Sequence, residues 1–418
     1  MKLAVCSMLI ACLAAPAVSA QEGGGEPAAT PPALAPAPAG EKEPEPAVEV
    51  IPPEPEKEAP VEKAEKPASP EPGTGINVVT SPHGSVKVGF VLQVGLDYIQ
   101  KQPGTTTDNT FQIKPTRARL LLSGFVLEKR INYLVQFDGV QGFQSILAGS
   151  EGQNRVYATA AEPAAPKVPF LLDMILSFDY IPKTTIKVGR FLSQFTYMMP
   201  RNTADLYMIY YPLVLLKLGA WRQFSIESIT TTQYLDFIVG IYNGPANNWG
   251  DDNLYKDYNL KFRIKPAPWI HFGMFSWVGM PKATVEDSKR PYALEVTYGG
   301  ELFIHPLEDR LKILFEGLAR TRFDYAPGPG GVQSGTQFGF YAHASYQLIK
   351  QLEILGRFDY YDPSTEAKSD IGWWTTVGIN YFLDGINAKL SLNYVYKVDE
   401  TKHFHGWSEV LAQASLHF

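Results

Sequence analysis

Three pairs of basic residues are the side chains whose spacing most clearly predicts shared chemistry. One residue separates the two members of each pair, so in an extended strand both side chains project to the same face. The pairs are Arg117 and Arg119, Lys261 and Arg263, and Arg320 and Arg322. A guanidinium group presents a planar fork of donors that suits phosphate-like anions. A surface that carries such pairs is predicted to attract anions.

Residues typical of catalytic or metal sites are scattered. Of the seven histidines only His403 and His405 are close in sequence, and no carboxylate lies at metal-ligand spacing from them. Both cysteines, Cys6 and Cys12, fall in the N-terminal apolar run, and no nucleophile elbow, zinc-binding helix or phosphate-cradling glycine loop is present. We therefore predict no catalytic residue, no metal and no cofactor. A barrel enzyme with a Ser/His pair on neighbouring strands stays an alternative.

The elements that must position the basic pairs are β-strands. From Val86 to Tyr98 the even positions are large and apolar, whereas the odd positions include Lys, Gly, Gln and Asp. Such a period of two predicts a strand with one apolar and one wet face. No run of about 18 apolar residues follows the N-terminus, which excludes membrane-spanning helices.

The same alternation recurs about sixteen times, in segments of roughly the 9–11 residues that cross a bilayer as a tilted strand. The predicted spans are 86–100, 111–127, 131–140, 170–182, 185–195, 219–229, 234–242, 256–265, 269–279, 290–304, 310–325, 336–348, 351–361, 372–382, 387–398 and 408–418. Their connections alternate short and long, and aromatic residues cluster at strand ends. This pattern predicts an all-β fold, a transmembrane antiparallel barrel of about 16 strands with both termini in the periplasm. A soluble β-sandwich or propeller is the alternative.

The N-terminal part of the chain has a different composition. Residues 1–20 are predicted to be a secretory signal peptide, with an apolar run and a small-residue cleavage site before Gln21. A lipidation box that would anchor the protein through Cys12 is the competing interpretation. Residues 21–74 are rich in Pro, Ala and Glu and contain no aromatic residue, which predicts a disordered periplasmic linker. It is either a tether that reaches peptidoglycan or another periplasmic partner, or a plain spacer.

The linker also carries the net charge of the chain. Residues 1–74 contain five Lys and twelve Glu, a net of −7 against −6 for the whole chain, so residues 75–418 carry +1. We expect the barrel domain, 75–418, to have lumen-facing basic residues at the three pairs and at Arg357, with almost as many acidic residues. A ladder of anion sites and a set of ion pairs across the wall are both compatible with this pattern.

One long connection, Thr196–Lys217, is unusually apolar for an outer loop. It contains two apolar stretches, 197–201 and 207–212, the second of which begins at Tyr207. We expect it to fold into the barrel and narrow it, placing Arg201, Tyr207 and Lys217 at a constriction. The alternative is that it covers a subunit interface.

Several segments resemble the phosphate-selective porin O and P family. They are Gly89–Gln93, Arg117–Gly124 with Tyr133–Asp138, Ile186–Phe191, Val239–Gly244, Val377–Phe382 and the terminal Phe418. Where the family usually has Gly-Gln-Phe, this chain has Gly-Arg-Phe at 189–191, so Arg190 departs from the pattern. The resemblance implies a sixteen-stranded barrel, often trimeric, that admits anions such as phosphate, and a terminal aromatic residue read by the outer-membrane assembly machinery.

These observations together predict an outer-membrane porin for passive diffusion of small hydrophilic solutes, with a preference for anions. The expected partners are outer-membrane lipid, small anions such as phosphate and two further copies of the chain in a homotrimer; no nucleic-acid partner is expected. A plugged receptor or adhesin barrel is a further alternative, although it would need about twenty-two strands and a folded plug.

Overall fold

The computed structural model describes residues 75–100, 108–127, 129–140, 171–244, 253–281, 294–323, 335–367, 370–399 and 406–418. The predicted signal peptide, Cys12 and the predicted linker at 21–74 lie outside the described residues and stay predictions. His403 and His405 lie outside them as well.

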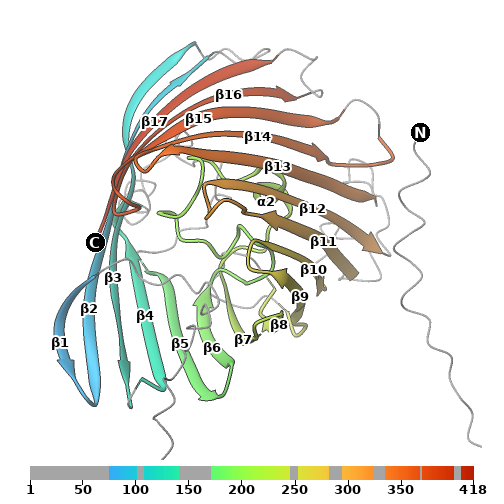
Figure 1. Ribbon diagram of the computed structural model, residues 1–418. Helices are drawn as coiled ribbons and strands as arrows, with labels where there is room; N and C mark the ends of the chain where they lie inside the picture. Colours follow the sequence, from blue (N-terminus) through green and yellow to red (C-terminus); the bar gives the residue numbers. More distant parts are fainter. Residues whose placement is uncertain are drawn as a thin grey trace, which may run out of the picture. The chain divides into compact units, whose positions relative to one another are not determined.

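Sixteen long strands make up the wall of the barrel. They are β2 (Gly84–Ile99), β3 (Thr110–Val126), β4 (Ile131–Asp138), β5 (Leu171–Ile181), β6 (Thr184–Phe191), β7 (Gln223–Thr231), β8 (Leu235–Tyr242), β9 (Asp257–Ala267), β10 (Ile270–Gly279), β11 (Leu294–Ile304), β12 (Leu311–Phe323), β13 (Thr336–Ile349), β14 (Leu352–Asp362), β15 (Gly372–Asp384), β16 (Ala388–Asp399) and β17 (Trp407–His417). Each pairs antiparallel with the next along the chain, as the curved wall in Figure 1 shows.

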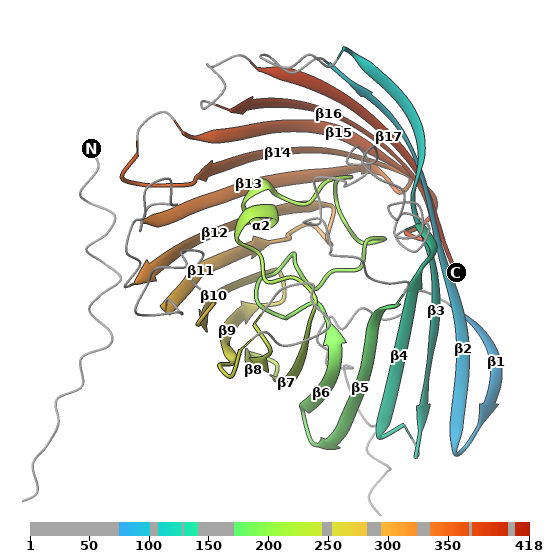
Figure 2. The ribbon, with the colours of Figure 1, turned by 180° about the vertical axis from the view of Figure 1, so that it is seen from behind.

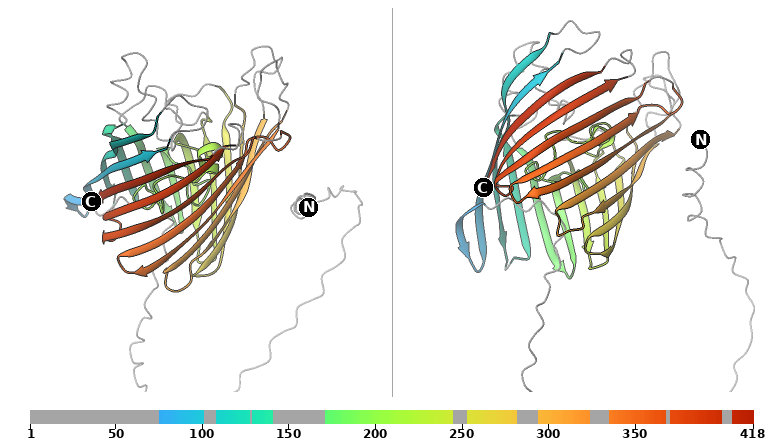
Figure 3. Two further views of the ribbon diagram at one scale, coloured as in Figure 1. Left: turned by 90° about the horizontal axis from the view of Figure 1, so that it is seen from above. Right: turned by 45° about the horizontal axis from the view of Figure 1, so that its top comes forward.

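The sheet closes on itself because β17 pairs antiparallel with β2, from Glu409 opposite Ile99 to His417 opposite Val91. The ring from β2 to β17 therefore has no open edge. The predicted all-β fold, an antiparallel barrel of sixteen strands, is confirmed. Seen from two further directions, the strands run obliquely around the wall, as closure of a barrel requires (Figure 3).

A seventeenth strand, β1 (Ile76–Ser81), was not predicted. It forms a hairpin with β2 and pairs with residues 84–88, whereas β17 pairs with residues 91–99 of the same strand. One edge of β2 pairs with β3. The other edge pairs with β1 near its start and with β17 over the rest, so β1 and β17 lie end to end along it.

The two faces of the wall differ as the alternation predicts. On β16, Leu390, Leu392 and Tyr394 are 44–45% exposed, whereas Lys389 and Asn393 are buried on the lumen side. The apolar face of the barrel therefore points outward, as in barrels that stand in lipid. Within the described residues, no helix has both the length and the apolar character needed to cross a membrane.

Candidate functional site in the barrel lumen

The segment 192–222, which connects β6 to β7, fills part of the barrel interior. Figure 2 shows it inside the curved wall, together with the short helix α2 (Leu213–Leu218). Many of its apolar side chains are buried, Met199 and Leu215 completely, and they pack in one cluster with wall residues such as Leu314 and Leu318. Burial of these side chains against the wall stabilises the inward position of the segment.

Acceptors on the wall bind the backbone of this inner segment. The amide of Tyr197 donates to the Glu316 carboxylate at 2.5 Å, and the amide of Leu213 donates to the Asp359 carboxylate at 2.9 Å. A third amide, that of Ile209, donates to the Asn393 side chain at 2.9 Å. Three backbone amides of the inner segment, which have no strand partner, thus find hydrogen-bond acceptors at three separate places on the wall.

Basic side chains of the wall hold carbonyl groups of the same segment. Lys389 donates to the carbonyls of Ala204 and Leu206 at 3.1 and 2.9 Å. Two of the predicted pore-lining residues do the same: Arg357 donates to the carbonyls of Tyr210 and Tyr211, and Arg320 donates to that of Leu218. These cations therefore have a structural task in fixing the segment.

The predicted pore-lining basic residues lie on the lumen side and have acceptors close by. The contacts are Arg117 with Gln93 at 2.6 Å, Arg119 with Asp138 at 2.9 Å, Lys261 with Glu301 at 2.6 Å, Arg263 with Glu301 at 2.7 Å, Arg320 with Glu295 at 3.1 Å, Arg322 with Glu295, and Arg357 with Asp359 at 2.7 Å. The ion-pair alternative raised by the sequence describes Arg119, Lys261, Arg263, Arg320, Arg322 and Arg357. Arg117 has an amide acceptor.

Arg201, predicted at the constriction, has a different environment. Its guanidinium lies 4.4 Å from the ring centroid of Tyr197 and 5.0 Å from that of Tyr207, and it donates to the Tyr197 hydroxyl. Tyr207 in turn stacks on His343, with ring centroids 4.8 Å apart. Two aromatic rings therefore fix the cation in place.

Lys217, the third residue predicted at the constriction, lies elsewhere. It is exposed on α2, with its ammonium 6.0 Å from the ring centroid of Tyr361. The structure thus brings Arg201 and Tyr207 together and separates Lys217 from them.

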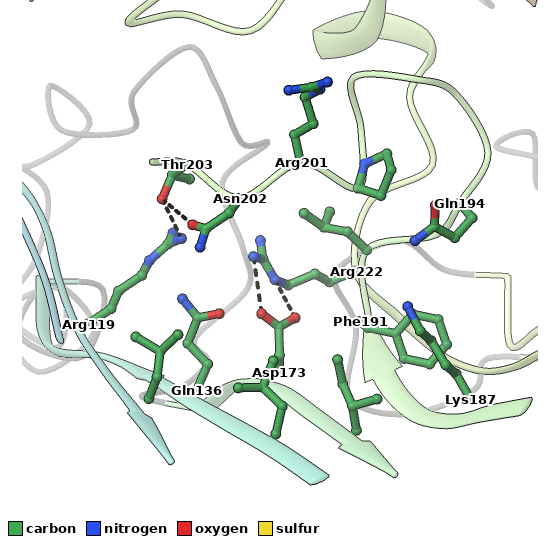
Figure 4. A pocket seen from close by; sticks show the side chains of 15 residues that line it. Arg119, Gln136, Asp173, Lys187, Phe191, Gln194, Arg201, Asn202, Thr203 and Arg222 are labelled. Atoms are coloured by element: carbon green, nitrogen blue, oxygen red, sulfur yellow. Dashed lines mark hydrogen bonds and ion pairs between the residues drawn. The ribbon is translucent and has the colours of Figure 1, made fainter. Parts of the chain in front are cut away.

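A cavity lies between Pro200–Thr203 of the inner segment and the wall strands β3–β6 (Figure 4). It holds about 550 Å³ of empty space, its open side included. Four of its lining residues are basic, namely Arg119, Lys187, Arg201 and Arg222, and one, Asp173, is acidic. Two of the four basic residues are ion-paired: Arg119 with Asp138 and Arg222 with Asp173.

Arg222 was missed by the sequence prediction. It donates to both carboxylate oxygens of Asp173, at 2.8 and 3.4 Å. The predicted strand 219–229 included Arg222, and its alternation would turn this side chain outward. The structure begins β7 at Gln223, so Arg222 belongs to the inner segment, where the two-residue period does not apply. Within the part of the chain that the structure describes, no group of three His, Cys, Asp or Glu side chains is placed to hold a metal.

Comparison with known proteins identifies the architecture. No protein-family model and no curated protein matches this sequence. Among solved structures, the chain is similar to the anion-selective porin from Comamonas acidovorans, with 13% identity, a TM-score of 0.55 and coverage of 80% of this chain and 100% of that one. The outer membrane channel DcaP of Acinetobacter baumannii has 11% identity, a TM-score of 0.55 and coverage of 81% and 99%.

A third similar structure is the outer-membrane expressed OmpT of Vibrio cholerae, with 10% identity, a TM-score of 0.53 and coverage of 81% of this chain and 99% of that one. Nearly the whole length of each solved chain is matched. The chain therefore has the β-barrel fold of outer-membrane porins.

Proposed function

We propose that this protein is an outer-membrane porin that lets small hydrophilic solutes diffuse passively, with a preference for small anions such as phosphate. The observation that carries the proposal is the lumen cavity, which lies between the wall and the inner segment and is lined by four basic residues and one acidic residue. A pore selects by the size and charge of its narrowest part. In this proposal the narrowest part lies between the wall and the inner segment that carries Arg201.

The outer surface supports the location. Exposed apolar residues recur along the outward positions of the strands, for example Leu390, Leu392, Val410 and Leu416. Such a surface is stable in lipid and would aggregate in water. The proposal includes export by a cleaved signal peptide, a periplasmic linker at 21–74 and assembly as a homotrimer.

The plugged-receptor alternative is less well supported. The ring has sixteen strands, fewer than the roughly twenty-two of plugged transporters. The inner segment is a connection of the barrel itself, rather than a separately folded domain.

Planar-bilayer recording tests the proposal. Purified protein is added to a bilayer in a KCl gradient, and conductance steps and the reversal potential are measured. We expect discrete steps and a reversal potential of the sign that anion flow produces. Cation selectivity would refute the anion preference, and absence of conductance would refute the porin function. A barrel enzyme would instead show hydrolysis that depends on a lumen Ser or His.

A further inference from the structure

Lumen-facing side chains between the ends of the strands are buried on strands spread around the ring. The lumen face of a water-filled barrel is ordinarily polar, because it contacts water. Here many of its members are large and apolar, and the examples are at most 7% exposed: Leu121 on β3, Ile175 on β5, Phe275 on β10, Leu318 on β12, Tyr341 on β13 and Leu411 on β17. These side chains therefore face protein rather than water.

Lumen-facing charges with more contact to water lie near the strand ends. The side chain of Arg322, one residue before the end of β12, is 32% exposed. At the opposite end, near the short turns, the side chains of Lys265 on β9 and Lys312 on β12 are 25% and 27% exposed. Lys261 and Glu316, further inside on the same two strands, are at most 1% exposed. The described lumen of these strands thus has two wet ends and a dry middle.

The inner segment crosses this dry middle from a single side of the wall. Its two ends continue neighbouring strands, because Phe191 at the end of β6 pairs with Gln223 at the start of β7. From there the segment reaches across the lumen, where α2 lies against β12–β14 (Figure 2). A segment joined covalently to one side only can move away from the other side while the strands keep their pairing, as hinged elements do.

On the far side, polar side chains of four strands hold the backbone of the inner segment. We call these four residues the latch. They are Arg320 on β12, Asp359 on β14, Asn380 on β15 and Asn393 on β16. Release of the latch breaks no strand pairing, and water from the two wet ends can replace the lost partners, so the net cost of each bond is small.

A glycine on β13 forms the place where α2 docks. Val214 of α2 is fully buried. A Cβ on Gly339 would lie 2.7 Å from the Val214 Cγ2 and 3.1 Å from the Val214 Cβ. These distances are too short for a side chain at residue 339, so the absence of one is what allows α2 to reach the wall.

We propose that the inner segment is a gate, and that the structure shows it closed. Solutes pass when the part of the segment around α2 leaves the latch and Gly339, while the ends at Phe191 and Gln223 stay in place. The inference rests on the proposed porin function and concerns its regulation. The channel then alternates between closed periods and openings instead of staying open.

The test is single-channel recording of the full chain with the substitutions Val214→Cys and Gly339→Cys in planar bilayers. Both native cysteines, Cys6 and Cys12, lie within residues 1–20, so the barrel domain has none. The two new Cβ atoms would be 3.1 Å apart, slightly closer than the about 3.5–4.5 Å of a disulfide, which a small shift of α2 provides. Oxidation should abolish channel openings, and dithiothreitol should restore them.

The matched control is the pair Gly317→Cys and Phe340→Cys. These residues are directly opposed on β12 and β13, and a Cβ on Gly317 would lie 3.6 Å from that of Phe340. This disulfide joins the wall to itself beside Gly339 and does not touch the inner segment. Oxidation of the control pair should therefore leave the openings unchanged.

A second variant acts in the opposite direction and leaves the wall intact. Val214→Asp places a charge in a buried apolar position, which should drive α2 from the wall. We expect its closed periods to disappear. It decides the question by itself if the cysteine pair at 214 and 339 fails to give folded protein on unheated gels.

The outcomes separate the gate from the porin function. Openings that persist after oxidation, with the disulfide verified by mass spectrometry, would overturn the gate. So would an unmodified channel that stays open continuously, or closed periods in Val214→Asp as long as those of the unmodified protein. Each of these results leaves the porin function standing. Absence of conductance from the unmodified protein and from Val214→Asp would overturn both.

Discussion

Phe418 and Phe90 close the barrel through a reciprocal pair of backbone hydrogen bonds. The amide of Phe90 donates to the carbonyl of Phe418 at 2.6 Å, and the amide of Phe418 donates to the carbonyl of Phe90 at 3.1 Å. Their ring centroids are 5.7 Å apart. A Cβ on Gly89 would lie 3.0 Å from the Phe418 carbonyl oxygen and 3.9 Å from the Gly75 Cα. The last residue of the chain therefore meets the start of the β1–β2 hairpin at the closing seam.

Deletion of Phe418 should reduce insertion into membranes and leave the conductance of each inserted channel unchanged. The deletion removes two hydrogen bonds of the seam and an aromatic ring that is 49% exposed at its end. The measurements are the folded fraction on gels without heating and single-channel conductance. Leu416→Ala is the control, because Leu416 has the same exposed fraction and lies on the same face of β17. Normal insertion of the deletion variant would refute a role in assembly.

Replacement of Asn380 and Asn393 by Ala should loosen the inner segment without changing the charge of the lumen. Asn393 accepts the amide of Ile209, and Asn380 donates to the carbonyl of Tyr207. A buried polar group that loses its partner costs about 1–3 kcal/mol. We expect larger and noisier single-channel currents in the double variant.

Asn132→Ala is the control for this variant. Asn132 donates to Asp179 on the neighbouring strand, so its loss leaves these two contacts of the inner segment in place. Currents as steady and as small as those of the unmodified protein would show that these two contacts do not hold the segment.

Replacement of Arg201 by Gln should lower the anion preference. The interaction of one unit charge with an ion about 4 Å away in water is worth about 1 kcal/mol. Loss of this attraction should lower the permeability ratio of anion to cation about fivefold at low ionic strength. The reversal potential in a KCl gradient measures this ratio. Arg130→Gln removes an exposed cation beside Tyr180, outside the cavity lining, and should leave the ratio unchanged. Equal ratios in the two variants would refute the role of Arg201.

The strands could be predicted from the sequence because the two faces of the wall have different surroundings, apolar outside and polar inside. Apolar and polar residues therefore alternate along each strand. The span predicted at 387–398, for example, is observed at Ala388–Asp399. β1 escaped prediction for a physical reason. Its six residues are all exposed, and a bulge between Asn77 and Val79 interrupts the alternation.

The partners of the lumen side chains were harder to predict. A register shift in the β2–β3 pairing changes which positions face inward, so Lys114 points into the lumen beside Asp97 at 2.5 Å, although strict alternation from Arg117 would place it outside. The inward fold of Thr196–Lys217 was expected from its apolar content. Its contact with Asp359 joins residues 146 positions apart, a pairing that no local pattern indicates.

Replacement of Asp359 by Ala should destabilise the barrel strongly, and a second substitution should restore part of the loss. The fully buried carboxylate of Asp359 accepts from Arg357 at 2.7 Å and from the amide of Leu213 at 2.9 Å. Removing one member of a buried ion pair costs about 3–5 kcal/mol, because the other charge stays in a place of low polarity. The temperature of unfolding in detergent should therefore fall markedly.

The double variant Asp359→Ala, Arg357→Met separates the two contributions. It removes the uncompensated cation but still lacks the acceptor for Leu213, so its unfolding temperature should lie between those of the single variant Asp359→Ala and the unmodified protein. Arg357→Met also frees the carbonyls of Tyr210 and Tyr211, which is why recovery should be incomplete. A double variant no more stable than Asp359→Ala would show that the inner segment, rather than the ion pair, accounts for the loss.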